Sequence, residues 1–190
     1  MPVVVTGQNF NGFTCVYHDD FNAMAELMKR MIASGRKHIA YIGASEKDLQ
    51  AGSARRRGAE MAYMQAGFDK KNLIKATVDF TAEDGYEAAK KILKKHPRVD
   101  GILCASDIIA IGAIKAIREA GKEPGKDVGI CGVDDMWMDR FGATPLTSAH
   151  LYFEECGLRA AELLLDEITE PSKMKQQICL DFSIVERGSI

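Results

Sequence analysis

The sequence of 190 residues lacks long apolar runs and lacks an excess of charge of either sign. No segment approaches the roughly 18 consecutive apolar residues that a membrane-spanning helix needs. The opening MPVVVTGQNF has neither the basic nor the apolar region of a signal peptide. Lysine and arginine number 25 against 27 aspartate and glutamate residues, so the formal net charge is -2. We therefore expect a cytoplasmic protein that binds no membrane and offers no basic surface for DNA.

Motifs of catalysis and metal binding are also missing. The sequence contains no GxGxxG, GxxxxGK[ST], GxSxG or HExxH pattern. Its four histidines are dispersed and lie at no recognisable metal-ligand spacing. Its five cysteines include no CxxC pair, and the odd number favours reduced thiols, which we interpret as small apolar fillers. We predict a protein that is not an enzyme and that uses no metal and no cofactor.

Helical and strand patterns alternate along the chain. Strand patterns occupy residues 2–5, 38–42, 73–78, 99–104, 128–133 and 177–185. Helix starts are predicted at side chains that can cap the first turn, namely Asp20, Ser53, Thr81 and either Ser106 or Asp107. One further helix has an apolar face made of Ala161, Leu164, Leu165 and Ile168. This alternation predicts an α/β fold around a parallel sheet.

Such sheets bind ligands beyond the carboxyl ends of their strands, where helices begin. Asp134 and Asp135 follow a strand, and Asp107 ends another. These carboxylates could hold Mg²⁺, or they could serve as helix caps and turn formers. A carboxylate, an arginine and an aromatic ring in one crevice equally suit a polyhydroxylated ligand, because vicinal hydroxyls bond to the charges and the ring covers the apolar sugar face.

Six motifs in this order resemble the effector-binding core of lactose-repressor (LacI) family transcription regulators. They are SGRKHIAYIG (residues 34–43), Arg55-x-x-Gly58, ASDIIAIGAIKAIREAG (105–121), PGKDVGICGVDD (124–135), TPLTSAH (144–150) and IVERGS (184–189). The resemblance covers essentially the whole chain. Within the family, VVVTGQNFNGF and YHDDFNA are similar to the trehalose repressor, which suggests trehalose or its phosphate as effector.

The resemblance implies a fold like that of periplasmic sugar-binding proteins, with two Rossmann-like parallel-sheet subdomains joined by three crossings of the chain. Residues 1–42 and 150–181 would form an incomplete N-terminal subdomain, and residues 43–149 and 182–190 a C-terminal subdomain. The family's DNA-binding headpiece would precede this region. Operator DNA is therefore expected as a partner only of a full-length protein, and a homodimer is expected.

Family effector contacts can be carried over by motif to five positions of this chain: Arg55, Phe80, Ser106, Asp107 and Asp134. Two further candidate ligand contacts are Trp137, the only tryptophan, and Gln8, in the loop after the first strand. We expect Arg55 and Asp134 to face one solvated crevice and to supply most hydrogen bonds to the ligand. Arg55 could instead be one of three solvated arginines on a helix, and Ser106 only a helix cap. Phe80 could belong to the core, and Trp137 could either stack on a sugar or pack on the subdomain surface.

For Gln8 the resemblance is weaker, because the family often places an effector-binding aspartate in that loop, where this chain has Gly7 and Gln8. The favoured function is a repressor core that senses a sugar or sugar phosphate. A transport-type periplasmic sugar-binding protein is the alternative, disfavoured by the five thiols and the lack of an export signal. A sugar-acting enzyme is the third hypothesis, which no motif supports.

Overall fold

The computed structural model describes residues 1–170 and 174–190, so residues 171–173, inside the expected range 150–181, lie outside the described residues. The chain forms two compact units. The smaller unit contains Met1–Asp19 and Leu151–Phe182, and the larger one contains Asp20–His150 and Ser183–Ile190. The chain thus passes from one unit to the other three times. Among the described residues no helix is long and apolar enough to span a membrane.

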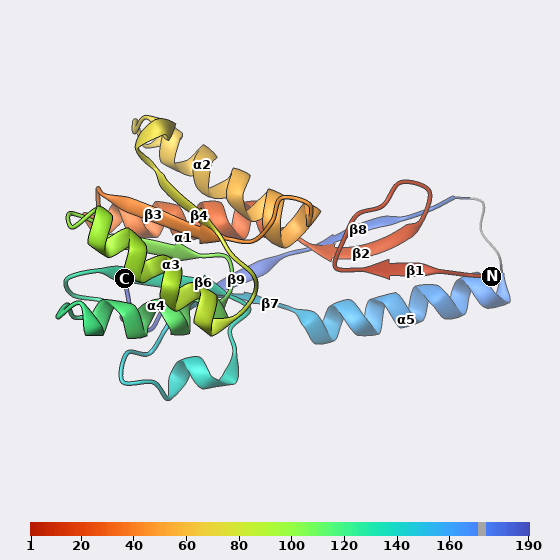
Figure 1. Ribbon diagram of the computed structural model, residues 1–190. Helices are drawn as coiled ribbons and strands as arrows, with labels where there is room; N and C mark the ends of the chain where they lie inside the picture. The colour runs from red at the N-terminus through yellow and green to blue at the C-terminus, as the bar shows by residue number, and fades with distance from the viewer. Residues whose placement is uncertain (171–173) are drawn as a thin grey trace. The chain divides into compact units, whose positions relative to one another are not determined.

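The larger unit is built on a six-stranded sheet in the order β4-β3-β5-β6-β7-β9 (Figure 1). The strands are β3 (Ile39–Gly43), β4 (Ile74–Thr77), β5 (Gly101–Cys104), β6 (Gly129–Val133), β7 (Thr147–Leu151) and β9 (Phe182–Val185). The neighbours from β4 to β7 pair in parallel. Every residue of β3, β5 and β6 is buried, as expected of parallel strands covered by helices on both faces.

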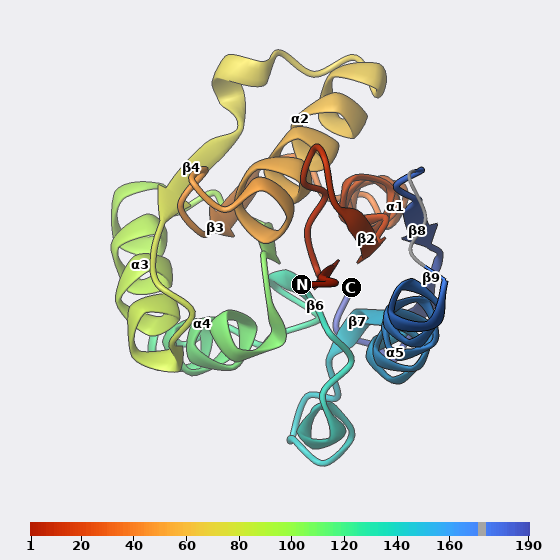
Figure 2. The same cartoon turned by 90° about the vertical axis from the view of Figure 1, so that its right-hand side faces the viewer.

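Two pairs of helices cover this sheet. The helices α1 (Asp20–Ala33) and α2 (Arg55–Gln65) pack together, and α3 (Ala82–Lys95) packs with α4 (Asp107–Glu119) on the other face (Figure 2). Glycines allow the close approach within each pair. A Cβ at Gly58 would lie 2.0 Å from the carbonyl oxygen of Phe21, and one at Gly112 would lie 1.8 Å from that of Ala82. Both helix contacts therefore depend on the absence of a side chain.

The smaller unit has a three-stranded sheet in the order β1-β2-β8, all parallel, and one helix, α5 (Phe153–Thr169). Its strands are β1 (Val4–Thr6), β2 (Thr14–His18) and β8 (Gln177–Leu180). Cys156, Ala160 and Leu163 of α5 pack against Val16 of β2. The helix expected around Ala161, Leu164, Leu165 and Ile168 is present, but Ala161, Leu165 and Ile168 are exposed and Leu164 is half-buried.

The expected α/β architecture around parallel sheets is confirmed, and several local expectations are corrected. Residues 20–42, expected in the partial subdomain, lie in the larger unit, because α1 packs on α2 and β3 pairs with β4 and β5. The strands β2 and β7 were not predicted. The expected strand over residues 177–185 is two strands, β8 and β9, which belong to different sheets.

Helix caps and thiols also differ in part from the expectation. Thr81 caps α3 through the amide of Asp84, as predicted. Ser53 does not cap α2, because it lies inside a π-helical turn, Leu49–Ala54, which is capped by the side chain of Asp48. Four cysteines are buried, whereas Cys179 is exposed and is therefore not a core filler.

Candidate functional site

Arg55 begins α2, directly after the π-helical turn that follows β3, and only 5% of the residue is exposed. Its Nε donates a hydrogen bond to the carboxylate of Asp20 at 2.6 Å. Its Nη1 donates to the carbonyl oxygen of Ala105 at the end of β5, and its Nη2 lies 3.5 Å from Oδ1 of Asp134. Arg55 is therefore a buried anchor, and the expectation of a solvated side chain is wrong.

The pairing of Arg55 with Asp20 was missed from the sequence, where Asp20 is read only as a helix cap. Burial works against the charged guanidinium, but the carboxylates of Asp20 and Asp134 raise the pKa of Arg55. Burial raises the pKa of Asp134 to about 6, although the nearby Arg55 lowers it. The cluster thus places the guanidinium of Arg55 between the carboxyl groups of Asp20 and Asp134, of which Asp134 is the more exposed.

The backbone at Asp134 and Asp135 is unusual. Their φ angles are 115° and 53°, a region that residues other than glycine rarely adopt. Several contacts hold Asp135 in this turn. Its amide donates to Ser148 Oγ at 3.0 Å, and its carboxylate pairs with His150 Nδ1 at 3.1 Å and with the guanidinium of Arg187. This strained and well-anchored turn fixes the direction of Asp134, as often happens at functional sites.

Asp107 supports the same turn from inside the unit, where it is fully buried. The hydroxyl of Ser148 donates to its carboxyl group at 2.8 Å, and the amide of Met136 donates at 3.1 Å. Burial, together with the contact with Asp139, raises the pKa of Asp107 to about 9. Asp107 is therefore neutral near pH 7 and bonds to internal groups.

Ser106 lies between Ala105, whose carbonyl accepts from Arg55, and the first residue of α4. It stands at the cap position, but its side chain makes no capping hydrogen bond. Its buried Oγ has no hydrogen-bond partner among the described residues. Because buried hydroxyls are nearly always hydrogen-bonded, this atom is a candidate ligand contact beside the Arg55 cluster.

The three remaining predicted positions lie elsewhere. Phe80 follows β4 and is 43% exposed, so it is not a core residue. Trp137 lies in a 3-10 turn, Trp137–Arg140, is 71% exposed, and has its ring centroid 6.0 Å from that of the equally exposed Phe141. Gln8 is half-buried and follows β1 in the smaller unit. The structure thus brings Arg55, Ser106 and Asp134 into one neighbourhood of the larger unit.

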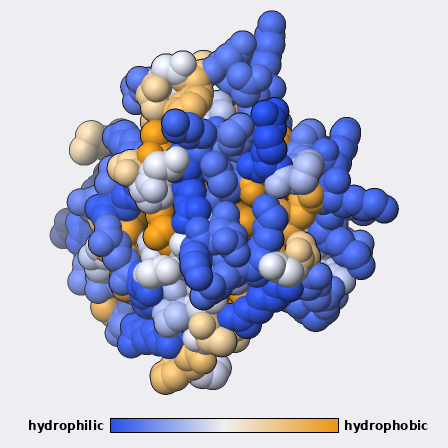
Figure 3. Space-filling view, turned by 90° about the vertical axis from the view of Figure 1, so that its left-hand side faces the viewer, coloured by the Kyte–Doolittle hydropathy of each residue, from blue (hydrophilic) through white to orange (hydrophobic). Residues whose placement is uncertain are grey.

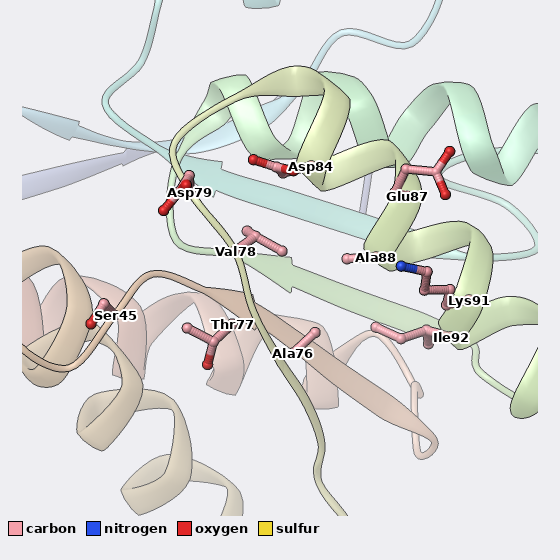
Figure 4. A pocket seen from close by; sticks show the side chains of 10 residues that line it. All are labelled: Ser45, Ala76, Thr77, Val78, Asp79, Asp84, Glu87, Ala88, Lys91 and Ile92. Carbon is pink, nitrogen blue, oxygen red and sulfur yellow. The ribbon is translucent and has the colours of Figure 1, made fainter.

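A cavity of about 480 Å³ opens beside the end of β4 (Figure 4). Asp79 follows the strand, whereas Asp84, Glu87 and Lys91 project from α3. Neither Arg55 nor the other predicted ligand contacts line this cavity. Within residues 1–170 and 174–190, no group of three or more histidine, cysteine, aspartate or glutamate side chains could hold a metal ion.

The profile of the periplasmic binding protein-like domain matches residues 28–190. The chain belongs to this domain family. Its curated relatives include the HTH-type transcriptional regulator CelR of Thermobifida fusca, 29% identical over 171 residues, which are 90% of this chain and 50% of CelR. The HTH-type transcriptional repressor PurR of Histophilus somni is 32% identical over 192 residues, 100% of this chain and 57% of PurR. The chain thus spans about half the length of these relatives.

Solved structures show the same relationship. A ribose-bound LacI family regulator from Enterococcus faecium has a TM-score of 0.91 and 26% identity, over 99% of this chain and 70% of that one. A complex of CelR with cellobiose has a TM-score of 0.91 and 28% identity, over 98% of this chain and 58% of that one. The likeness to the effector-binding core of LacI-family regulators is confirmed, and none of these relatives is a trehalose repressor.

Proposed function

We propose that this chain is the ligand-sensing core of a cytoplasmic transcription repressor and that its effector is a sugar or sugar phosphate. The observation that carries the proposal is the pair of Arg55 and Asp134, 3.5 Å apart, beside the unpartnered hydroxyl of Ser106. These groups lie after β3, β5 and β6, at the strand ends where parallel sheets bind ligands. Relatives bound to ribose and cellobiose support the same ligand class.

Each residue would have a separate role in binding the sugar. Asp134 accepts hydrogen bonds from sugar hydroxyls, and Ser106 supplies a further donor or acceptor. Asp20 is a positioning residue that keeps Arg55 charged and directed at Asp134. Asp107 positions the turn that carries Asp134. Phe80 and Gln8 are retained as secondary contacts, and the smaller unit is proposed to correspond to the incomplete N-terminal subdomain.

A thermal-shift screen with ribose, cellobiose, trehalose and their phosphates would identify the effector, since a ligand that binds only the folded chain raises its melting temperature. Calorimetry would then compare Asp134→Ala and Ser106→Ala with Asp79→Ala, an exposed carboxylate outside the cluster. Because Arg55 keeps Asp20 as its partner, Asp134→Ala should fold normally. We expect a loss of affinity of about ten- to a hundredfold for Asp134→Ala, and none for Asp79→Ala. Unchanged affinity of Asp134→Ala would refute the site.

The homodimer is proposed on a different surface of the larger unit. The exposed Trp137 and Phe141 lie next to a cavity of about 320 Å³, whose apolar lining comes from Ile111, Ile114, Met138 and Leu146. Exposed aromatic residues beside an apolar hollow are typical of protein interfaces. Sedimentation of the chain should show a dimer that the double variant Trp137→Ser/Phe141→Ser converts to a monomer. A wild-type monomer at high concentration would refute this surface.

A further inference from the structure

A third cavity lies at the end of the larger unit where its strands begin, opposite the end that carries Arg55. Its volume is about 720 Å³. It is enclosed by residues that precede β3, β4 and β5, three neighbouring strands of the sheet, together with the ends of α2 and α3. Figure 3 looks onto this end of the unit, where hydrophilic residues predominate. The volume is within the range of small-molecule sites.

The rim of this cavity is basic. Four cations from separate segments line it, namely Lys37, Lys71, Lys95 and Arg98. None of these four side chains forms an ion pair with a described residue. Nearby Lys70 and Lys75, in contrast, both pair with the carboxylate of Glu60, at 2.6 and 2.9 Å. The rim therefore keeps positive charge that the chain does not neutralise by direct pairing.

Two carboxylates adjacent in sequence to residues of the lining, Asp100 and Asp69, accept hydrogen bonds from backbone amides. Asp100 accepts hydrogen bonds from the backbone amides of Lys37 and His38, and it lies 3.5 Å from His38 Nδ1. Asp69 caps a short 3-10 turn by accepting from the amide of Lys71. A cation at the end of a helix often only complements the helix dipole, which would explain Lys95 at the last position of α3. Lys37 and Arg98 lie outside helices, so this explanation does not cover them.

The wall of the cavity is apolar and aromatic. Phe68 stacks on the buried Tyr63 with ring centroids 4.8 Å apart and planes 18° apart, and both residues line the cavity. Ile74 and Val99 complete the apolar part of the lining. An aromatic wall under a cationic rim is complementary to a ligand with a flat or apolar body and an anionic group.

We propose that this basic cavity binds an organic phosphate of the nucleoside di- or triphosphate class. The phosphates contact Lys37, Lys71, Lys95 and Arg98, with Arg98 able to bind two oxygens at once. The base or sugar lies against Phe68. The site is separate from Arg55 and Asp134, so it does not rest on the proposed sugar effector and would give the core a second ligand.

Calorimetric titration of the 190-residue chain with ATP tests this proposal. Titrations with pyrophosphate and with adenosine test separately the phosphate part of the ligand and its base and sugar. We expect ATP to bind and pyrophosphate to bind more weakly. Arg98→Ala and Lys95→Ala should each weaken ATP binding about tenfold or more, since hydrogen bonds to charged partners are the strong ones. Phe68→Leu should weaken binding of ATP and leave that of pyrophosphate unchanged.

Lys94→Ala is the matched control, because Lys94 is the exposed neighbour of Lys95 on α3 and does not line the cavity. An equal loss in Lys94→Ala and Lys95→Ala would show general surface attraction and overturn the proposal. A lack of ATP binding at millimolar concentration would overturn it as well. Loss of ATP binding in Asp134→Ala, with Arg98→Ala unaffected, would place the phosphate at the sugar site and also overturn it.

Discussion

The two units bury their apolar residues to very different extents. In the larger unit, helices pack on both faces of the six-stranded sheet, and β3, β5 and β6 are buried throughout. In the smaller unit, α5 packs one face on three strands and leaves Leu158, Leu165 and Ile168 about 60% exposed. Because apolar burial is the main favourable contribution to folding, stability should reside mostly in the larger unit. Substitutions of the same kind should therefore change the free energy of unfolding more in the larger unit than in the smaller one.

The largest expected difference concerns ion pairs. Asp20→Ala leaves Arg55 as a buried cation with only the more distant Asp134, and it should lower the free energy of unfolding by about 3–5 kcal/mol. Glu162→Ala in α5 breaks the exposed pair with Arg159 and should cost less than about 1 kcal/mol. Urea denaturation of both variants measures this. Equal losses of unfolding free energy in Asp20→Ala and Glu162→Ala would contradict the predicted difference between the two units.

Glycines provide a second comparison. In Gly112→Ala the new methyl group would meet the backbone of Ala82, so the contact between α3 and α4 must open, at a cost of about 1–3 kcal/mol. Nothing lies within 4 Å of a Cβ at Gly157 in α5, so Gly157→Ala should stabilise the helix by up to about 1 kcal/mol. Thermal denaturation should show a lower melting temperature for Gly112→Ala and a higher one for Gly157→Ala. A stabilising Gly112→Ala would contradict the packing described for the larger unit.

The buried carboxyl group of Asp107 predicts a pH effect confined to the larger unit. Its pKa is about 9 in the fold and about 4 in an unfolded chain, so its contribution to stability is complete below about pH 4 and is lost as the pH rises toward 9. Asparagine mimics the neutral acid and does not titrate. The stability of Asp107→Asn relative to the unsubstituted chain should therefore increase from pH 5 to pH 8.5, as melting curves would show. A difference that stays constant over this range would mean that Asp107 is ionised in the fold.

A smaller pH effect is expected at the sugar site. With its pKa near 6, Asp134 is mostly ionised at pH 7.5 and mostly neutral at pH 5. If the carboxylate is the form that accepts sugar hydroxyls, affinity should fall by up to about tenfold over this interval. Calorimetry at both pH values tests this, with Asp134→Asn as the variant in which the change should disappear. An equal decline in Asp134→Asn would assign the effect to another group.

The alternation of strands and helices was sufficient to predict β3, β4, β5 and β6 of the larger unit, because β3, β5 and β6 are continuous apolar runs, but it missed β7. The smaller unit was harder. The strand β2 was not recognised, because the loops beside it show the same alternation of apolar and polar residues. The packed face of α5 could not be identified, because both faces of this helix carry apolar residues. Residues 177–185 form one apolar pattern, although the strands within it pair in different sheets.

Motifs predicted Arg55 and Asp134 but not how they are held. Asp20 lies 35 residues before Arg55, and no local pattern indicates that the two side chains bond. Asp107 and Ser106 are adjacent in sequence, yet one bonds to internal groups while the hydroxyl of the other has no described partner. Such differences depend on tertiary contacts, which a single sequence does not display.

The most direct measurement is a crystal structure of the chain with the sugar that raises its melting temperature most. The account predicts sugar hydroxyls within hydrogen-bond distance of the Asp134 carboxylate and of Ser106 Oγ, with Arg55 still bonded to Asp20. A sugar bound at another surface, with Asp134 and Ser106 making no contact to it, would contradict the central claim.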